Sequence, residues 1–201
     1  GIETRYSCVP LEWYERPHGW AEKNRLYLEN AVALIEKAAL DCLARAGLGV
    51  ADVDMVVSVS TSGIATPSLD ALLAERLNMR RDLQRLPIFG LGCAGGVLGL
   101  ARAAAMAQAS PGATVLFLVV ELCALTFRHT DKSKSNVIAT ALFGDGAAAA
   151  LVSCAGDGPA LTTWGEHTWP RSLDIMGWRV EDDGFGVLFS RDIPAIIRAD
   201  F

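Results

Sequence analysis

The stretch GLGCAGGVLGLARAAAMAQA, residues 90–109, together with TVLFLVV, residues 114–120, decides the fold. Beyond Cys93 the first run has only Arg102 and Gln108 as polar members. It therefore predicts a helix over 93–109 that is apolar nearly all round and must be covered on every side. The second run is continuously apolar, as expected for a strand buried on both faces. A buried helix beside a buried strand indicates a layered α/β fold with a central helical layer.

Segments on both sides of this stretch alternate between helix and strand patterns. An amphipathic helix is predicted over 26–46, with Gly47 as its stop. Pro67 is expected to open a second helix with leucines at helical spacing. Short strands are predicted by apolar runs bounded by polar turns, over 53–59, 86–89, 147–152 and 187–190. The alternation supports the α/β class.

Composition excludes several classes of protein. The net charge of −5 and the lack of a basic run argue against a nucleic-acid partner. Five cysteines, an odd number without a CxxC pair, indicate reduced thiols in a cytoplasmic protein and neither a disulfide framework nor a metal site. No apolar run is long enough to predict a membrane span. A cytoplasmic globular protein is expected.

Cys93 is the candidate nucleophile. It stands between a predicted strand and the first turn of the predicted helix, among small neighbours that let a substrate carbonyl approach the sulfur. The positive end of the helix dipole favours a thiolate, and backbone N–H groups there can hold a thioester oxyanion. The alternative is a cysteine that fills a small cavity in a glycine- and alanine-packed core. The local motif leaves both interpretations open.

Further motifs accompany the cysteine in a fixed order: TRY at 4–6, STSG at 60–63, VELCALTF at 120–127, SKSNVIATALFGDGAAAA at 133–150 and SRDIP at 190–194. Over nearly its whole length the chain resembles the type III polyketide synthases, the chalcone and stilbene synthase-like enzymes, of the bacterial type. The resemblance implies a thiolase-like layered α-β-α-β-α fold, of which residues 1–201 would form the N-terminal, nucleophile-bearing part. It also implies a homodimer that condenses malonyl-CoA onto an acyl-CoA starter, with no further cofactor and no metal.

The resemblance assigns two catalytic roles. Cys93 would take the starter acyl group as a thioester, which the carbanion from decarboxylated malonyl-CoA then attacks. Phe143 matches the gatekeeper phenylalanine of the family, whose apolar face favours the neutral product of decarboxylation. An ordinary core aromatic is the alternative for Phe143.

Positions that line the substrate cavity in the family correspond here to Thr61, Ser62, Thr66, Glu121, Cys123, Thr126, Gly177, Phe185 and Val187. Glu121 ends an apolar strand, which indicates either a polar network near the site or a solvated strand end. Cys123 replaces the threonine of plant members and resembles bacterial members with a tunnel for long acyl chains. Thr66 stands where plant members carry a methionine that reaches into the partner's cavity, so this contact between subunits is in doubt.

The catalytic histidine and asparagine of the family lie beyond Phe201, and both ends of the sequence look cut. His18 and His129 are expected at the surface, and His167 in packing or solvent. One alternative is another condensing enzyme, a ketoacyl synthase III or a hydroxymethylglutaryl-CoA synthase, which shares the cysteine and the GDGA turn. The other is an inert half-domain without activity of its own.

Overall fold

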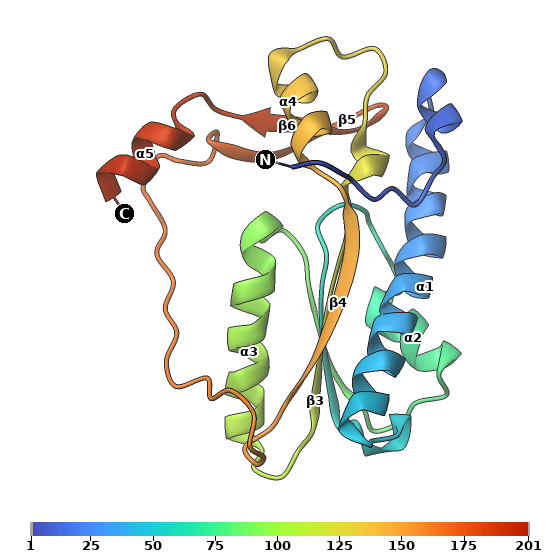
Figure 1. The fold of residues 1–201 in the computed structure, drawn as a ribbon, viewed down its shortest axis with the longest axis vertical. Coiled ribbons are helices and arrows are strands. Elements are labelled where there is room, and N and C mark those ends of the chain that lie inside the picture. The colour runs from blue at the N-terminus through green and yellow to red at the C-terminus, as the bar shows by residue number, and fades with distance from the viewer. Residues whose placement is uncertain (1, 201) are drawn as a thin grey trace. The chain divides into compact units, whose positions relative to one another are not determined.

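The computed structural model describes residues 2–200 and shows a mixed α/β chain (Figure 1). Its helices are α1 (Trp20–Ala46), α2 (Leu69–Arg76), α3 (Gly95–Ala109), α4 (Lys134–Leu142) and α5 (Ile193–Asp200). Its strands are β1 (Met55–Val59), β2 (Gln84–Ile88), β3 (Val115–Leu122), β4 (Asp145–Val152), β5 (Met176–Glu181) and β6 (Gly184–Phe189). Short 3-10 turns are η1 (Leu11–Glu15), η2 (Val50–Asp52), η3 (Gly92–Ala94) and η4 (Cys123–Thr126).

The described residues form two compact units. The sheet unit comprises Tyr27–Glu121 and Gly146–Glu166. The hairpin unit comprises the residues up to Leu26, Leu122–Asp145 and those from His167 onward. Each unit is described by itself.

A four-stranded sheet in the order β2-β1-β3-β4 is the centre of the sheet unit. Strand β1 pairs in parallel with both β2 and β3, so that Val57 lies between Leu86 and Phe117. All residues of β1 are buried, and β3 is largely so, which confirms the buried strand predicted over 114–120. Helix α3 covers one face of this sheet, and α1 and α2 cover the other (Figure 1).

Strand β2 lies at an edge of the sheet, and most of its residues are exposed. Pro87 within β2 lacks a backbone N–H, which an edge strand tolerates because one of its sides is unpaired. At the other edge, β4 is only half-buried, so the buried strand expected over 147–152 is wrong in its burial. An edge strand has a neighbour on one side alone, which leaves its side chains partly open to solvent.

Helix α1 begins at Trp20, six residues before the predicted start at Leu26, and ends at Ala46 as predicted. Gly47 follows with a φ of 67°, in the left-handed region where glycine carries no steric cost. Helix α2 begins at Leu69 with Ser68 as its extended N-cap, so the expected start at Pro67 is corrected by two residues. The predicted inner face of α1 is buried, with Val32, Ile35, Ala39 and Leu43 at most 7% exposed.

Helix α3 approaches the sheet unusually closely because glycine faces it at two positions. A Cβ on Gly95 would lie 2.6 Å from a methyl group of Val59. A Cβ on Gly99 would lie 2.5 Å from the other Val59 methyl group and 2.8 Å from the ring of Phe117. Only hydrogen fits at these distances, so the small residues of the 90–109 stretch set the spacing between helix and sheet.

Two expectations for this helix need correction. The α-helix begins at Gly95, and Cys93 lies in the preceding turn η3 instead of the first helical turn. The helix is also not covered on every side, since the side chain of Val97 is 73% exposed. Among the described residues, the face of α3 that packs against the sheet consists of glycines and alanines together with the partly buried Leu100 and Met106.

Gly99→Ala is expected to lower the free energy of unfolding of the full-length protein, because the added methyl group overlaps Val59 and Phe117. Overpacking of this kind costs about 1–3 kcal/mol. Gly96→Ala is the matched control, since a Cβ there meets nothing within 4 Å and alanine favours the helix by about 0.5–1 kcal/mol. Urea unfolding of both variants checks this, and equal stabilisation by the two would contradict close packing at Gly99.

The hairpin unit is built around β5 and β6, which pair antiparallel with Trp178 opposite Val187. Only a weak strand at 187–190 was predicted here. Strand β5 was missed because half of its residues are exposed, the others are only half-buried, and the segment shows no apolar run. Phe185 is buried at 3%, stacks on Trp178 and meets the edge of Trp20. Aromatic contacts therefore hold the hairpin to the start of α1.

Lys23 strengthens this contact from the buried side of α1. Its ammonium donates hydrogen bonds to the carbonyl oxygens of Phe127 and Asp183, at 2.8 and 2.9 Å. Burial lowers the pKa of Lys23, with the nearby charge of Arg128 acting in the same direction. The lysine thus ties the end of η4 to the hairpin turn. Within the described residues, no helix is both long enough and apolar enough to cross a lipid bilayer.

Candidate active site

Cys93 lies in a turn that only glycines can form. Gly90 and Gly92 have φ values of 93° and 54°, in the region that disfavours side chains. The turn closes when the N–H of Ala94 donates to the carbonyl of Leu91, at 3.2 Å. Cys93 is exposed, immediately before the first turn of α3. The sulfur is therefore accessible to a substrate carbonyl, as the nucleophile interpretation requires.

A hydrogen-bonded chain fixes this turn to the loop after β1. The N–H of Gly92 donates to the hydroxyl oxygen of Thr61, at 3.1 Å. Both carboxylate oxygens of Glu121 accept from the N–H of Thr61, at 3.0 and 3.1 Å. Thr61 and Glu121, two of the predicted positions, thus belong to one connected network that reaches Gly92, the residue before Cys93. A polar network is found at Glu121, and not merely a solvated strand end.

Glu121 is largely buried, and this burial raises the pKa of its carboxyl group. Hydrogen bonds from Ser62 and from the N–H of Thr61 act in the opposite direction, because they stabilise the carboxylate. The net shift is upward, so desolvation outweighs the hydrogen bonds. The folded protein consequently keeps a proton on Glu121 to a higher pH than the unfolded chain does.

The loop after β1, which carries Thr61, packs against Tyr27. The sequence motifs did not single out this tyrosine. Its hydroxyl donates to the hydroxyl of Ser60 at 2.8 Å, and burial raises its pKa to about 12. A Cβ on Gly63 would lie 2.2 Å from the Tyr27 ring, so glycine is required there. The STSG motif at 60–63 therefore forms a loop that packs closely against the buried Tyr27. Thr66, three residues further on, is exposed.

Glu121→Gln is expected to become more stable relative to wild type as the pH rises from about 4.5 to 8. The folded state binds the Glu121 proton more tightly, so wild-type stability falls as pH rises through the raised pKa, whereas glutamine has no proton to lose. Urea unfolding at several pH values measures the difference in the full-length protein. Glu75→Gln, at an exposed position on α2, is the control. If the difference in the free energy of unfolding between Glu121→Gln and wild type does not change with pH, desolvation does not dominate the pKa of Glu121.

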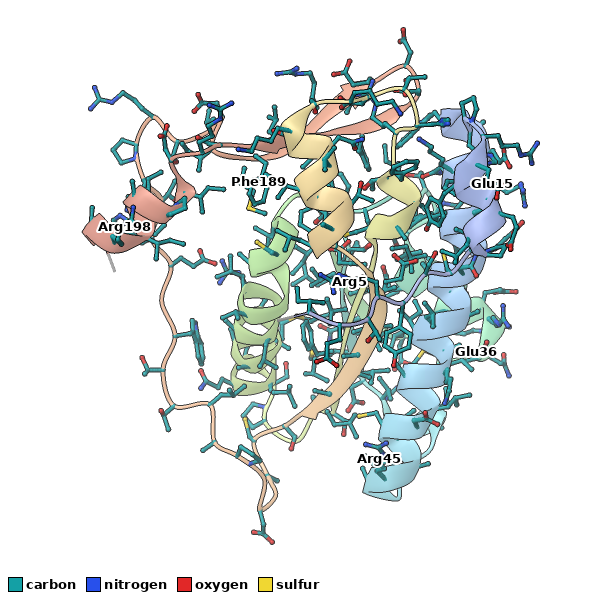
Figure 2. The ribbon with its side chains drawn as sticks, turned by 45° about the horizontal axis from the view of Figure 1, so that its top comes forward. Arg5, Glu15, Glu36, Arg45, Phe189 and Arg198 are labelled. Carbon is teal, nitrogen blue, oxygen red and sulfur yellow. The ribbon has the colours of Figure 1, made fainter. Side chains whose placement is uncertain are left out.

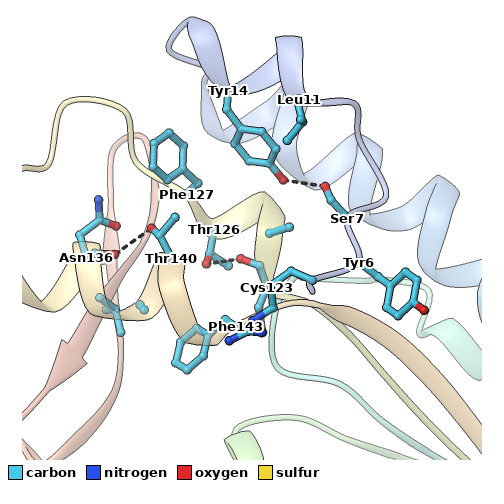
Figure 3. Close-up of a pocket in the computed structure, with 14 residues that line it drawn as sticks. Tyr6, Ser7, Leu11, Tyr14, Cys123, Thr126, Phe127, Asn136, Thr140 and Phe143 are labelled. Carbon is cyan, nitrogen blue, oxygen red and sulfur yellow. Dashed lines mark hydrogen bonds between the residues drawn. The ribbon is translucent and has the colours of Figure 1, made fainter. Parts of the chain in front are cut away.

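Four other predicted positions meet in the hairpin unit. Cys123, Thr126, Phe143 and Val187 line a cavity of about 370 Å³ (Figure 3). Ligand pockets typically have volumes from about 300 to 1,000 Å³. Gly177 and Phe185, in contrast, do not line it: Gly177 lies in β5, and Phe185 is part of the aromatic packing with Trp178. The cavity thus unites four of six predicted positions from this unit.

Phe143 is the C-cap of α4, where its N–H donates to the carbonyl of Ala139 at 2.8 Å. Its half-buried ring meets Trp178 edge to face, at a centroid distance of 6.1 Å. Helix α4 was not predicted, although its N-cap carries a sequence signal: the hydroxyl of Ser133 accepts from the N–H of Asn136. The cap and Trp178 together fix where the phenylalanine ring stands.

Asp145 was also missed and joins three segments around the cavity. Its carboxylate accepts the N–H of Cys8 at 2.7 Å and the N–H of Ala124 at 2.8 Å. Its own N–H donates to the carbonyl of Tyr6, at 2.9 Å. Asp145 of the GDG motif at 144–146 therefore holds the N-terminal segment and η4 at the end of α4.

Arg5 completes this junction at the C-terminal end of α4 (Figure 2). Its guanidinium donates to the carbonyl oxygens of Leu142 at 2.9 Å and Ala141 at 2.6 Å. These carbonyls are left without helical partners at a helix end, and a cation there also suits the helix dipole. The Arg5 side chain passes so close to Gly144 that a Cβ there would lie 3.1 Å from it. Along the chain, the carbonyl groups that Arg5 contacts directly precede Phe143, and Asp145 follows it.

The thiol of Cys8 contrasts with that of Cys93. Burial, followed by the charge of Asp145, raises the pKa of Cys8 to about 12. Cys8 is therefore a protonated, unreactive thiol at neutral pH. All five cysteines are free in the structure, as expected from their number and spacing.

His18 corrects the expectation of a surface histidine. It is 7% exposed and stacks on Trp13 at a centroid distance of 4.0 Å. Its Nε2 lies 2.7 Å from the carbonyl of Trp13, and its Nδ1 lies 2.9 Å from Glu22. His167 is exposed and meets the edge of Trp169. The role of His18 in this structure is to pack the start of α1.

Comparison with known proteins agrees with this geometry. Residues 18–157 match the family described as chalcone and stilbene synthases, N-terminal domain. The chain is 40% identical over 205 residues to 1,3,6,8-tetrahydroxynaphthalene synthase of Streptomyces peucetius subsp. caesius, covering 98% of this chain and 54% of the relative.

Solved structures give the same result. The crystal structure of 1,3,6,8-tetrahydroxynaphthalene synthase from Streptomyces coelicolor A3(2), described as a bacterial type III polyketide synthase, superimposes with a TM-score of 0.93 and 30% identity. The superposition covers 98% of this chain and 57% of that one. Germicidin synthase from Streptomyces coelicolor, also described as a type III polyketide synthase, gives a TM-score of 0.86 at 31% identity, over 90% of this chain and 48% of that one.

The superposition on type III polyketide synthases confirms the expected thiolase-like α/β fold. The chain belongs to the chalcone and stilbene synthase family and contains its N-terminal domain. It spans about half the length of the relatives it matches.

Proposed function

We propose that this chain is the nucleophile-bearing part of a type III polyketide synthase, an acyltransferase that joins an acyl-CoA starter to malonyl-CoA. The observation that carries the proposal is the exposed Cys93 in a glycine turn that Thr61 and Glu121 hold at the start of α3. Membership of the chalcone and stilbene synthase family supports it.

The proposed reaction needs no cofactor besides the CoA thioesters. The Cys93 thiolate attacks the acyl-CoA carbonyl, the carbon–sulfur bond to CoA breaks, and CoA leaves as its thiol. Malonyl-CoA then loses carbon dioxide, and its carbanion attacks the Cys93 thioester. The new carbon–carbon bond releases the Cys93 sulfur and gives a β-ketoacyl-CoA. Phe143 is proposed to present its apolar ring to the malonyl carboxylate, which favours the neutral product.

The proposed starter is a long, apolar acyl group, which would give alkylpyrone- or alkylresorcinol-type products. Cys123, Thr126, Phe143 and Val187 support this because they line one cavity in the hairpin unit. An aromatic polyketide is the second candidate, since the relatives compared above include 1,3,6,8-tetrahydroxynaphthalene synthases.

We further propose a cytoplasmic homodimer. The unpaired side of the edge strand β2 and the adjacent Phe89, 59% exposed, offer a border that a second copy can cover. Free thiols at all five cysteines agree with a reducing compartment. A ketoacyl synthase III is the less favoured alternative, because the relatives compared above are polyketide synthases.

Cys93→Ala in the full-length protein is expected to abolish product formation without loss of fold, because one sulfur atom is removed from an exposed position. In the wild type, mass spectrometry after incubation with an acyl-CoA is expected to place the acyl adduct on Cys93. Cys8→Ala is the control and is expected to retain activity, since the high pKa of Cys8 keeps it protonated. Near wild-type turnover by Cys93→Ala, or adducts on another cysteine, would refute the assignment.

The isolated chain of residues 1–201 is expected to form no polyketide. The histidine and asparagine that the family uses are not in this sequence, and both ring nitrogens of His18 already face Trp13 and Glu22. Loss of one electrostatic donor costs about 10²–10³ in rate, and loss of the base adds to this. Product analysis by liquid chromatography tests it, with circular dichroism to confirm folding. Condensation by the folded fragment would point to one of its own histidines.

A further inference from the structure

The cavity of the hairpin unit extends well beyond the positions that sequence motifs predict. Figure 3 shows Phe143 at one end of the lining and Tyr14 with Leu11 at the other, with Thr126 between them. Residues from the N-terminal segment, η4 and α4 all contribute to the lining, together with Val187 from β6. The N-terminal segment thus forms a wall of the same cavity that contains the proposed gatekeeper.

Polar groups along this wall are occupied by the protein itself. The hydroxyl of Thr126 donates to the carbonyl of Cys123 at 2.7 Å, and that of Thr140 donates to the carbonyl of Asn136 at 2.8 Å. The side-chain amide of Asn136 donates to two further backbone carbonyls. Groups already paired in this way gain little from a polar ligand. The cavity is suited to an apolar occupant.

A hydrogen-bonded pair lines the end of the cavity opposite Phe143. The hydroxyl groups of Tyr14 and Ser7 lie 2.6 Å apart, and the Ser7 hydroxyl also donates to the carbonyl of Val9. The Tyr14 ring meets Phe127 edge to face at 5.5 Å and Trp13 at 5.1 Å. Burial raises the pKa of Tyr14, so the ring ends in a neutral hydroxyl. Contacts on three sides hold this ring rigidly across the cavity.

Solvent lies close beyond this ring. Leu11 lines the same end of the cavity, yet its side chain is 80% exposed. This end of the cavity therefore lies near the surface, and the Tyr14 ring and Ser7 also line it. Removal of the ring would let a chain continue outward.

We infer that the cavity holds the saturated acyl chain of the starter and that Tyr14, held by Ser7, is its end wall and sets the longest chain accepted. The inference rests on the proposed polyketide synthase function. Tyr14 is a specificity-determining residue that acts by bulk at the end of the cavity opposite Phe143.

The test uses the full-length enzyme with malonyl-CoA and a series of starters, hexanoyl-, decanoyl-, tetradecanoyl- and octadecanoyl-CoA, and measures kcat/KM for each. In the wild type, kcat/KM is expected to rise to a maximum and then to decline as the starter chain becomes longer. Tyr14→Ala is expected to move the maximum to longer chains, with a gain of about fourfold for each additional methylene that becomes buried. Tyr14→Phe is the matched control, because it keeps the ring and should keep the wild-type maximum.

A second variant provides a test that does not depend on the folding of Tyr14→Ala. Leu11→Trp adds bulk at the same end from an exposed position, and it is expected to move the maximum to shorter chains. If the chain length that gives the highest kcat/KM is unchanged both in Leu11→Trp and in a folded Tyr14→Ala, Tyr14 is not the end wall of the cavity. If the wild-type enzyme prefers malonyl-CoA alone, the cavity does not hold a saturated acyl chain. Complete lack of condensation by wild type with any starter would instead refute the proposed function.

Discussion

The close approach of α3 to β1 is the constraint on which the rest of the site depends. Gly95 and Gly99 place the helix directly against Val59, the last residue of β1. The chain leaving β1 therefore runs immediately beside the turn that enters α3, and Thr61 can reach the N–H of Gly92. Any side chain larger than hydrogen at these two positions would push apart the two segments that this hydrogen bond joins. The position of Cys93 is thus a consequence of helix–sheet packing, and the glycines around it serve packing and turn formation at once.

Both units fix their loops with the same device, a half-buried carboxylate that accepts backbone N–H groups. Glu121, near the end of β3, holds the loop of Thr61, and Asp145, at the start of β4, holds the N–H groups of Cys8 and Ala124. A carboxylate offers two oxygens and can join loops that have no strand or helix to pair with. At Glu121 the desolvation cost exceeds what its hydrogen bonds return, because burial raises its pKa. An unfavourable placement of this kind is characteristic of a site where position matters more than stability.

Sequence patterns predicted the elements whose burial follows a simple period. Strands β1 and β3 are continuous apolar runs, and the inner face of α1 repeats at helical spacing, so all three were found. Strand β5 was missed because its exposed and half-buried residues leave no period to detect, and its order comes from pairing with β6. The motif around Cys93 located the candidate nucleophile, but the contacts of Arg5 with the end of α4 join residues more than 130 positions apart. Contacts of that kind leave no local signal, and neither Tyr14 nor Asp145 could be assigned a place at the cavity before the fold was known.

The chemistry of the thiols follows from where the fold places them. Cys8 is surrounded by apolar neighbours and faces the carboxylate of Asp145, and both effects oppose the loss of its proton. Cys93 is exposed, has no such carboxylate among its hydrogen-bond partners in the described turn, and precedes the positive end of a fifteen-residue helix. Among the five free cysteines, Cys93 and Cys154 are exposed, whereas burial and the charge of Asp145 keep Cys8 protonated. Exposure alone therefore does not single out Cys93; its glycine turn and its place directly before α3 do.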